Sequence, residues 1–294
     1  MSALPRFFTR TLCGTCVLLL LLQGTALAEG GEPGFDEKRS ARAVNVEPGF
    51  QGKKATRSAL AGNKDAWKAI TRSESVLDLA DAKVRAAAKE MHGVSLDADE
   101  HIAIQGNFTR DAVKKAKAGE ESPELMVIDL KDGSISFHRS GHRTVRLKDV
   151  SFPSKKELQA LGTNQVATAV EIIPDGTVQV LVWRKDEVAG ASKKKGKPTY
   201  AYKATVYKVI GNHIGAPLDR EVARSAAPGS APVVTATLEP TQKDQFTRFV
   251  YTPLRADGTP DKSNQLQLRW NQWEGVFRHP RPVPTAPKRD KTRS

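Results

Sequence analysis

The sequence predicts a mainly β protein with an N-terminal helical segment, and three observations lead to that fold class. Helical periodicity of apolar residues is confined to residues 57–97. From residue 98 onward, apolar and polar residues alternate as they do in strands with one buried face. Short turns containing Asp-Gly or Gly-Asn interrupt that alternation. With 39% hydrophobic and 27% charged residues, the composition is that of a globular protein and excludes collagen-like, coiled-coil and wholly disordered chains.

Residues 1–28 have the parts of a secretory signal peptide. Arg6 and Arg10 precede an apolar run, and the small-residue exit Ala26-Leu27-Ala28 follows it. The run is shorter than the ~20 residues that a membrane-spanning helix needs, so we expect cleavage after Ala28 rather than a retained anchor. Both cysteines of the chain, Cys13 and Cys16, lie inside this segment. Export without a disulfide favours a bacterial periplasm or cell surface.

Residues 29–56 are polar and basic, without apolar periodicity, and are expected to form a flexible leader. The tetrapeptide Glu-Pro-Gly-Phe occurs twice in this leader and ends at Phe35 and again at Phe50. Each copy predicts a turn that presents one aromatic ring. The two phenylalanines are therefore candidates for docking on a partner, and the alternative is that they pack on the protein's own surface or recur by chance.

The segment of residues 57–97 is expected to be helical and to pack on the sheet that follows. Ser75 with Asp78 resembles the start of a helix, and Gly93 supplies a residue suited to its end. A shorter helix around residues 64–70 would bury Trp67. The apolar stripe that predicts the main helix consists of Val76, Leu79, Ala80, Val84, Ala87, Ala88 and Met91.

Residues 98–279 are predicted to form a β-rich domain of repeated hairpins. The turn residues Asp132, Asp175, Asn212 and Asp257 mark four hairpins at steps of 43, 37 and 45 residues. These steps are near the ~40 to 50 residue period of propeller blades. A two-sheet sandwich explains the same alternation, so a small propeller-like array and a β-sandwich both remain open. The paired segments are residues 125–130 with 134–138, 166–173 with 177–183, 200–210 with a continuation from 213, and 246–254 with 266–270.

Part of this domain resembles exported β-propeller proteins of the FG-GAP and VCBS type. The resemblance rests on residues 104–108 and 123–133, and on a tryptophan-bearing closing hairpin at residues 270–277. It implies blade-like units of a β-propeller. The family's acidic calcium loop is not matched, because residues 109–122 form a long loop with Lys114, Lys115 and Lys117. We therefore expect neither a metal nor a cofactor.

No local motif predicts catalysis. The chain contains no zinc-binding His-Glu-x-x-His, nucleophile elbow or phosphate-binding glycine loop. His138 and His142 flank a turn and need not share a face. The acidic cluster around Asp97 and Asp99 fits a turn better than a pair of catalytic carboxylates. A hydrolase whose site is assembled only in space stays open as the alternative.

Positive charge is the feature most informative about function. Lys and Arg number 46 against 33 Asp and Glu, a net charge of +13 that falls to +11 without Arg6 and Arg10. A Pro-rich basic tail spans residues 280–294. The candidate ligand-binding residues combine cations with aromatic rings and are Arg139, Arg143, Arg146, Lys193, Lys194, Lys195, Lys197, Tyr200, Tyr202, Trp270 and Trp273. The alternative for the four lysines is a solvated loop, and the alternative for the two tryptophans is a role as core anchors.

The sequence as a whole predicts an exported, periplasmic or cell-surface protein that binds without catalysis. The expected partners are anionic polysaccharide, lipopolysaccharide or an envelope protein, because a basic surface attracts anions. Nucleic acid is not expected as a partner, because an exported protein is separated from the cell's nucleic acid and the sequence contains no nucleic-acid recognition motif. No transmembrane segment is expected after cleavage. The two alternatives are an exported hydrolase and an envelope assembly scaffold.

Overall fold

The computed structural model describes residues 58–61, 64–120, 124–188, 198–227, 229–243 and 246–280. Several predictions lie outside these residues and stay predictions. They are the signal peptide, the leader with Phe35 and Phe50, the loop residues Lys193, Lys194, Lys195 and Lys197, and the tail after residue 280.

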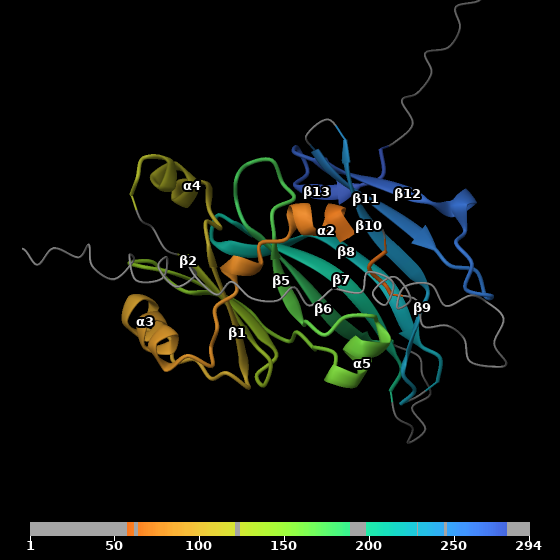
Figure 1. Cartoon of the computed structure of the whole chain (residues 1–294), viewed down its shortest axis with the longest axis horizontal. Helices are drawn as coiled ribbons and strands as arrows, with labels where there is room; N and C mark the ends of the chain where they lie inside the picture. The colour runs from red at the N-terminus through yellow and green to blue at the C-terminus, as the bar shows by residue number, and fades with distance from the viewer. Residues whose placement is uncertain are drawn as a thin grey trace, which may run out of the picture. The chain divides into compact units, whose positions relative to one another are not determined.

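The described part of the chain is mainly β, which confirms the predicted fold class. Its strands form three antiparallel sheets, each containing strands in chain order (Figure 1). The first sheet consists of β1 (His101–Gly106), β2 (Glu124–Asp129), β3 (Ser134–Arg139) and β4 (Val145–Leu147). The second consists of β5 (Ala167–Val170), β6 (Gln179–Glu187), β7 (Tyr200–Ile210), β8 (His213–Ser225) and β9 (Pro232–Val234). The third consists of β10 (Ala236–Lys243), β11 (Phe246–Pro253), β12 (Leu266–Asn271) and β13 (Val276–Arg278).

All four predicted hairpins are present, as β2–β3, β5–β6, β7–β8 and β11–β12. Each of the four connections has a glycine with positive φ, a conformation that glycine adopts without strain, and these are Gly133, Gly176, Gly211 and Gly258. The second and third hairpins share the second sheet. The four predicted hairpins therefore do not each lie in a separate sheet.

The second sheet lies between the other two because both of its faces are apolar. Along β6, Val180 and Val182 pack with residues of the first sheet. Leu181 and Trp183 alternate with them and pack in a cluster that includes Phe249 of the third sheet. Strand residues one position apart point to opposite faces, so a continuous apolar run is what such a central layer requires. The second sheet is visibly curled in Figure 1.

Short helices lie between and before the strands. They are α2 (Lys64–Ile70), α3 (Ala82–His92), α4 (Arg110–Lys117) and α5 (Lys155–Ala160), together with the 3-10 turns η1 (Ser73–Ser75) and η2 (Lys262–Asn264). The helix α3 packs on the outer face of the first sheet, where Ala88 joins Ala103, Leu125 and Val127 (Figure 1). A helical segment therefore covers the sheet, as the sequence predicts.

The predicted start of the main helix is wrong. The helix begins at Ala82, and the Asp81 side chain caps it by accepting a hydrogen bond from the Lys83 amide. Val76 precedes the helix, forms a backbone bridge with Ile104 of β1, and packs its side chain against the core cluster that contains Ile104. Met91 is 43% exposed rather than buried. The predicted end is confirmed, because Gly93 terminates α3 in the left-handed conformation.

Residues 109–122 are not simply a long loop. Thr109 caps the helix α4 by accepting a hydrogen bond from the Ala112 amide, and Ala112 and Val113 are buried. The three lysines of this segment therefore lie on a helix whose other side packs against the protein.

Candidate functional site

Arg139, one of the candidate ligand-binding residues, balances a buried carboxylate. Its side chain is only 18% exposed, and its Nε lies 3.6 Å from Oε1 of the fully buried Glu124. Glu124 also accepts hydrogen bonds from the amides of Phe108 and Thr109, at 2.7 and 2.8 Å, and from the Thr109 hydroxyl at 2.5 Å. A buried charge is stable only when it is paired and hydrogen-bonded. Arg139 therefore serves the fold.

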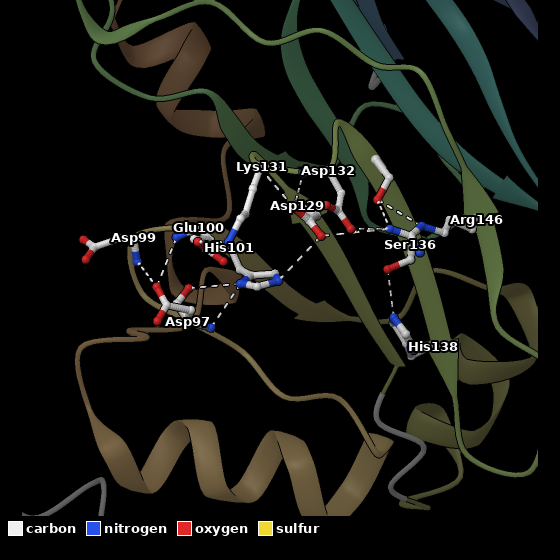
Figure 2. A network of polar contacts seen from close by, with 11 residues as sticks. Asp97, Asp99, Glu100, His101, Asp129, Lys131, Asp132, Ser136, His138 and Arg146 are labelled. Atoms are coloured by element: carbon white, nitrogen blue, oxygen red, sulfur yellow. Dashed lines mark hydrogen bonds and ion pairs between the residues drawn. The ribbon is translucent and has the colours of Figure 1, made fainter.

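Arg146 is also engaged within the chain. Its Nε and Nη2 donate to the Ser134 hydroxyl at 3.0 and 2.9 Å, and Nη2 lies 3.5 Å from Asp132 (Figure 2). Arg143 is exposed in the connection between β3 and β4. Of the three hairpin arginines, only Arg143 therefore faces solvent without such partners among the described residues.

Two histidines, His101 and His138, lie on the same side of the first sheet as Arg146, and each makes its own polar contacts (Figure 2). Nδ1 of His101 accepts a hydrogen bond from the Asp97 amide at 3.0 Å, and its Nε2 lies 3.8 Å from Asp129. Nε2 of His138 lies 2.8 Å from the Ser136 hydroxyl. Burial lowers the pKa of His138, and the nearby His92 and Arg146 lower it further. His138 is therefore a neutral base at pH 7.

These contacts do not combine into a catalytic triad. Nδ1 of His138 faces the Thr144 hydroxyl at 3.3 Å, where a triad has a carboxylate. His101 has a carboxylate neighbour, but its other ring nitrogen faces a backbone amide. Asp97 accepts from the amides of Asp99 and Glu100, so this acidic cluster shapes a turn, as the sequence predicts. The described residues also contain no group of three or more His, Cys, Asp or Glu that could hold a metal ion.

The aromatic candidates on β7 differ in exposure. Tyr202 is fully buried and its hydroxyl donates to Glu157 at 2.6 Å, so its ring offers no surface to a ligand. Tyr200 is half-buried, packs on Tyr202, and has Lys185 Nζ 4.8 Å from its ring centroid. Burial acts to raise the pKa of Glu157, but hydrogen bonds from Tyr202, Ser154 and Lys185 outweigh it and lower the pKa to about 2.

The two tryptophans of the closing hairpin also have different surroundings. Trp270 is half-buried and its ring lies 5.5 Å from that of the buried Phe277. Trp273 is 88% exposed in the turn between β12 and β13. The Asn271 side chain fixes this turn by accepting hydrogen bonds from the Trp273 and Glu274 amides at 3.0 and 3.1 Å. The turn therefore holds a large apolar ring in solvent.

A cleft of about 340 Å³ brings Trp270 together with three arginines that come from distant parts of the chain. Arg110 begins α4, Arg248 lies on β11 and Arg269 lies on β12. The cleft is lined by Arg110, Ile173, Pro174, Asp175, Thr247, Arg248, Arg269, Trp270 and Gln272. Its volume is within the range of small-ligand sites. We call this set of residues the arginine cleft.

Asp175 is the acidic residue of the arginine cleft, and the chain itself largely satisfies it. Its Oδ2 accepts a hydrogen bond from the buried Lys208 at 2.7 Å and lies 3.6 Å from Arg110. Burial acts to raise the pKa of Asp175, but hydrogen bonds from Lys208 and Thr177 outweigh it and lower the pKa. Burial lowers the pKa of Lys208, which Asp175 opposes. Three arginines and one carboxylate, which is already paired with Lys208, line the cleft, so its net charge is positive.

The sequence predicted Trp270 as a site residue but not the arginines around it. Arg110, Arg248 and Arg269 are isolated cations in sequence, and only the fold brings them together. No protein-family model, curated protein or solved structure matches this chain. Within the described ranges, no helix is long and apolar enough to cross a membrane.

Proposed function

We propose that this chain is an exported, non-catalytic binding protein of the periplasm or cell surface, and that it takes anionic envelope material in the arginine cleft. The observation that carries the proposal is that Arg110, Arg248 and Arg269 line one cleft together with Trp270. Export is supported by the signal-like residues 1–28. The net charge of +13 supports an anionic partner.

The chemistry of the arginine cleft suits a sugar that carries a carboxylate or phosphate. A guanidinium group donates two parallel hydrogen bonds to either anion. An indole offers an apolar face to a sugar ring and keeps one N–H for a polar partner. The Gln272 side chain adds an amide that both donates and accepts. Anionic polysaccharide and the sugar-phosphate part of lipopolysaccharide both have these groups.

Hydrolysis is less well supported than binding. Among the described histidines, His138 contacts hydroxyls and His101 lies near a carboxylate, but neither has both, and no described histidine lines the arginine cleft. An assembly scaffold that docks through Phe35 and Phe50 depends on residues outside the described ranges.

Calorimetric titration of the purified protein with oligogalacturonate and with lipopolysaccharide tests the binding proposal. We expect binding to at least one of them, and we expect the double variant Arg110→Gln/Arg269→Gln to weaken it about a hundredfold, since each lost charged contact costs about tenfold. Arg224→Gln is a matched control, because Arg224 is exposed on β8 and pairs with Glu221. Full binding by the double variant, or no binding by the native chain, would contradict the proposal.

The proposed export has a separate test. Cell fractionation with mass spectrometry of the native product should find the protein outside the cytoplasm with Glu29 at its N-terminus. A product that retains Met1 and stays in the cytoplasm would contradict export.

A further inference from the structure

The outer face of the third sheet carries three arginines in one row across three strands. Arg248 of β11 is paired in register with Arg269 of β12, and Arg269 is paired in register with Arg278 of β13. Their neighbours Phe249, Leu268 and Phe277 are buried against the second sheet. Because side chains alternate along a strand, the three arginines point away from that core. We call them the arginine row.

The arginine row is unfavourable for the sheet itself. Like charges directly opposite each other on neighbouring strands destabilise the pair. Arg278 pairs with Glu274 of the adjacent turn, and Arg248 also has an interaction within the chain. The side chain of Arg269, in the middle, has no ion pair or hydrogen bond with any described residue. The unpaired guanidinium group of Arg269, in the middle of the row, therefore points to an external anion.

The arginine row adjoins the arginine cleft at one end of the third sheet, with the row on the outer face and Trp270 of the cleft on the core side. Arg248 and Arg269 belong to both, and Arg278 extends the row by one strand beyond the cleft. Neighbouring strands lie about 4.8 Å apart, so the row offers guanidinium groups at a regular spacing of about that length at their bases. The exposed Trp273 lies in the turn that joins β12 to β13. The cleft, the row and this ring therefore belong to one end of the third sheet.

We propose that the arginine row and Trp273 extend the cleft into a binding track for a linear acidic polysaccharide with carboxylates on successive sugar units. This inference rests on the proposed function of the cleft and specifies its ligand as a polymer rather than a single charged sugar. Each carboxylate takes one guanidinium group, and one sugar ring stacks on Trp273. A polyphosphate would pair with the arginines of the row, but it has no apolar face that could stack on Trp273. Single-stranded nucleic acid has such a face, but the signal-like residues 1–28 disfavour it as a partner.

The test compares ligand lengths. The purified full chain is titrated by calorimetry with galacturonic acid and with its hexamer, and we expect the hexamer to bind at least about tenfold more tightly because its charges engage the row simultaneously. Arg278→Gln and Trp273→Ala should each weaken hexamer binding about fivefold to tenfold and leave monomer binding unchanged. Arg224→Gln should alter neither. Trp273 is 88% exposed and the Arg278 side chain is 33% exposed, and circular dichroism with the unfolding midpoint verifies that each variant folds.

The outcomes separate the track from the cleft. If the hexamer binds no more tightly than the monomer, or if Arg278→Gln and Trp273→Ala both leave hexamer binding unchanged, the track is wrong while the cleft proposal stands. If neither sugar nor lipopolysaccharide binds, the proposed function itself fails. If a polyphosphate or an oligodeoxynucleotide of equal charge binds the native chain as tightly as the hexamer, the assignment to acidic polysaccharide is wrong.

Discussion

The first and third sheets both carry arginines, but the arginines have opposite surroundings. Arg139 and Arg146 of the first sheet contact Glu124, Ser134 and Asp132. Arg248, Arg269 and Arg278 of the third sheet stand opposite one another in register. The first arrangement stabilises the fold, whereas the second aligns three like charges, and of these only the Arg269 side chain lacks a partner among the described residues. A basic residue therefore becomes informative about a ligand only when the acids and hydroxyls around it are known.

The largest expected effect concerns the buried carboxylate of the first sheet. Glu124→Ala should lower the free energy of unfolding by about 3 kcal/mol or more, because it leaves Arg139 without its buried partner and two amides without an acceptor. Urea denaturation measures this loss. Glu120→Ala is the control, since Glu120 is exposed after α4 and should change stability by no more than about 0.5 kcal/mol. Equal effects of both variants would show that Arg139 does not need Glu124.

A second, smaller effect concerns Glu157, which pairs with Lys185 at 3.0 Å and accepts from Tyr202. The pKa of about 2 lies below the ordinary value, so the ionised carboxylate stabilises the fold above pH ~4.5, and this contribution is lost as the pH falls toward 2. Glu157→Gln should cost about 1.5 kcal/mol at pH 7. Its unfolding free energy should also vary less than that of the native chain between pH 4.5 and 2. Identical pH profiles would contradict this role.

In the arginine row, a loss of charge should not cost stability. Arg269→Gln removes the middle of three aligned cations, so the free energy of unfolding should stay constant or rise by up to about 0.5 kcal/mol. Denaturation in low salt, where charge repulsion is strongest, measures the change. A clear destabilisation would mean that Arg269 has a structural role, and the contrast between the sheets would disappear.

The smallest effect on stability is expected at Trp273. Since the side chain is 88% exposed, Trp273→Ala should change the unfolding midpoint by less than the error of a thermal melt. Trp270→Ala is the comparison, because Trp270 packs on Phe277 and should lower that midpoint measurably. If both variants have the same midpoint, Trp270 is not a core anchor that differs from the surface ring of Trp273.

Local chemistry explains why the fold could be predicted further than the site. The hairpins around Asp132 and Asn212 are encoded within a few residues of turn and alternating pattern. The helix start was predicted wrongly because Val76 and Leu79 have helical spacing but lie before the helix. Ser154 with Glu157 is a capping box that the sequence contains, and it marks the short helix α5.

The site depends on contacts that no local pattern encodes. Arg110 and Arg269 are far apart in the chain, and the fold alone places them on one cleft. The register between β11 and β12 could not be predicted, because the connection between them includes η2 and has no fixed hairpin geometry. Without that register, Arg248 and Arg269 are two separate surface cations. Trp273 could be predicted as a candidate, but its exposure could not.

The salt dependence of polysaccharide binding tests the central claim most directly. Titrations of the native chain with the galacturonate hexamer at rising salt concentrations give the slope of log affinity against log salt. Binding by the arginine cleft and row predicts that affinity falls steeply with salt and that Arg269→Gln makes the slope shallower. An affinity that stays constant as salt rises, or a slope that Arg269→Gln leaves unchanged, would contradict the claim.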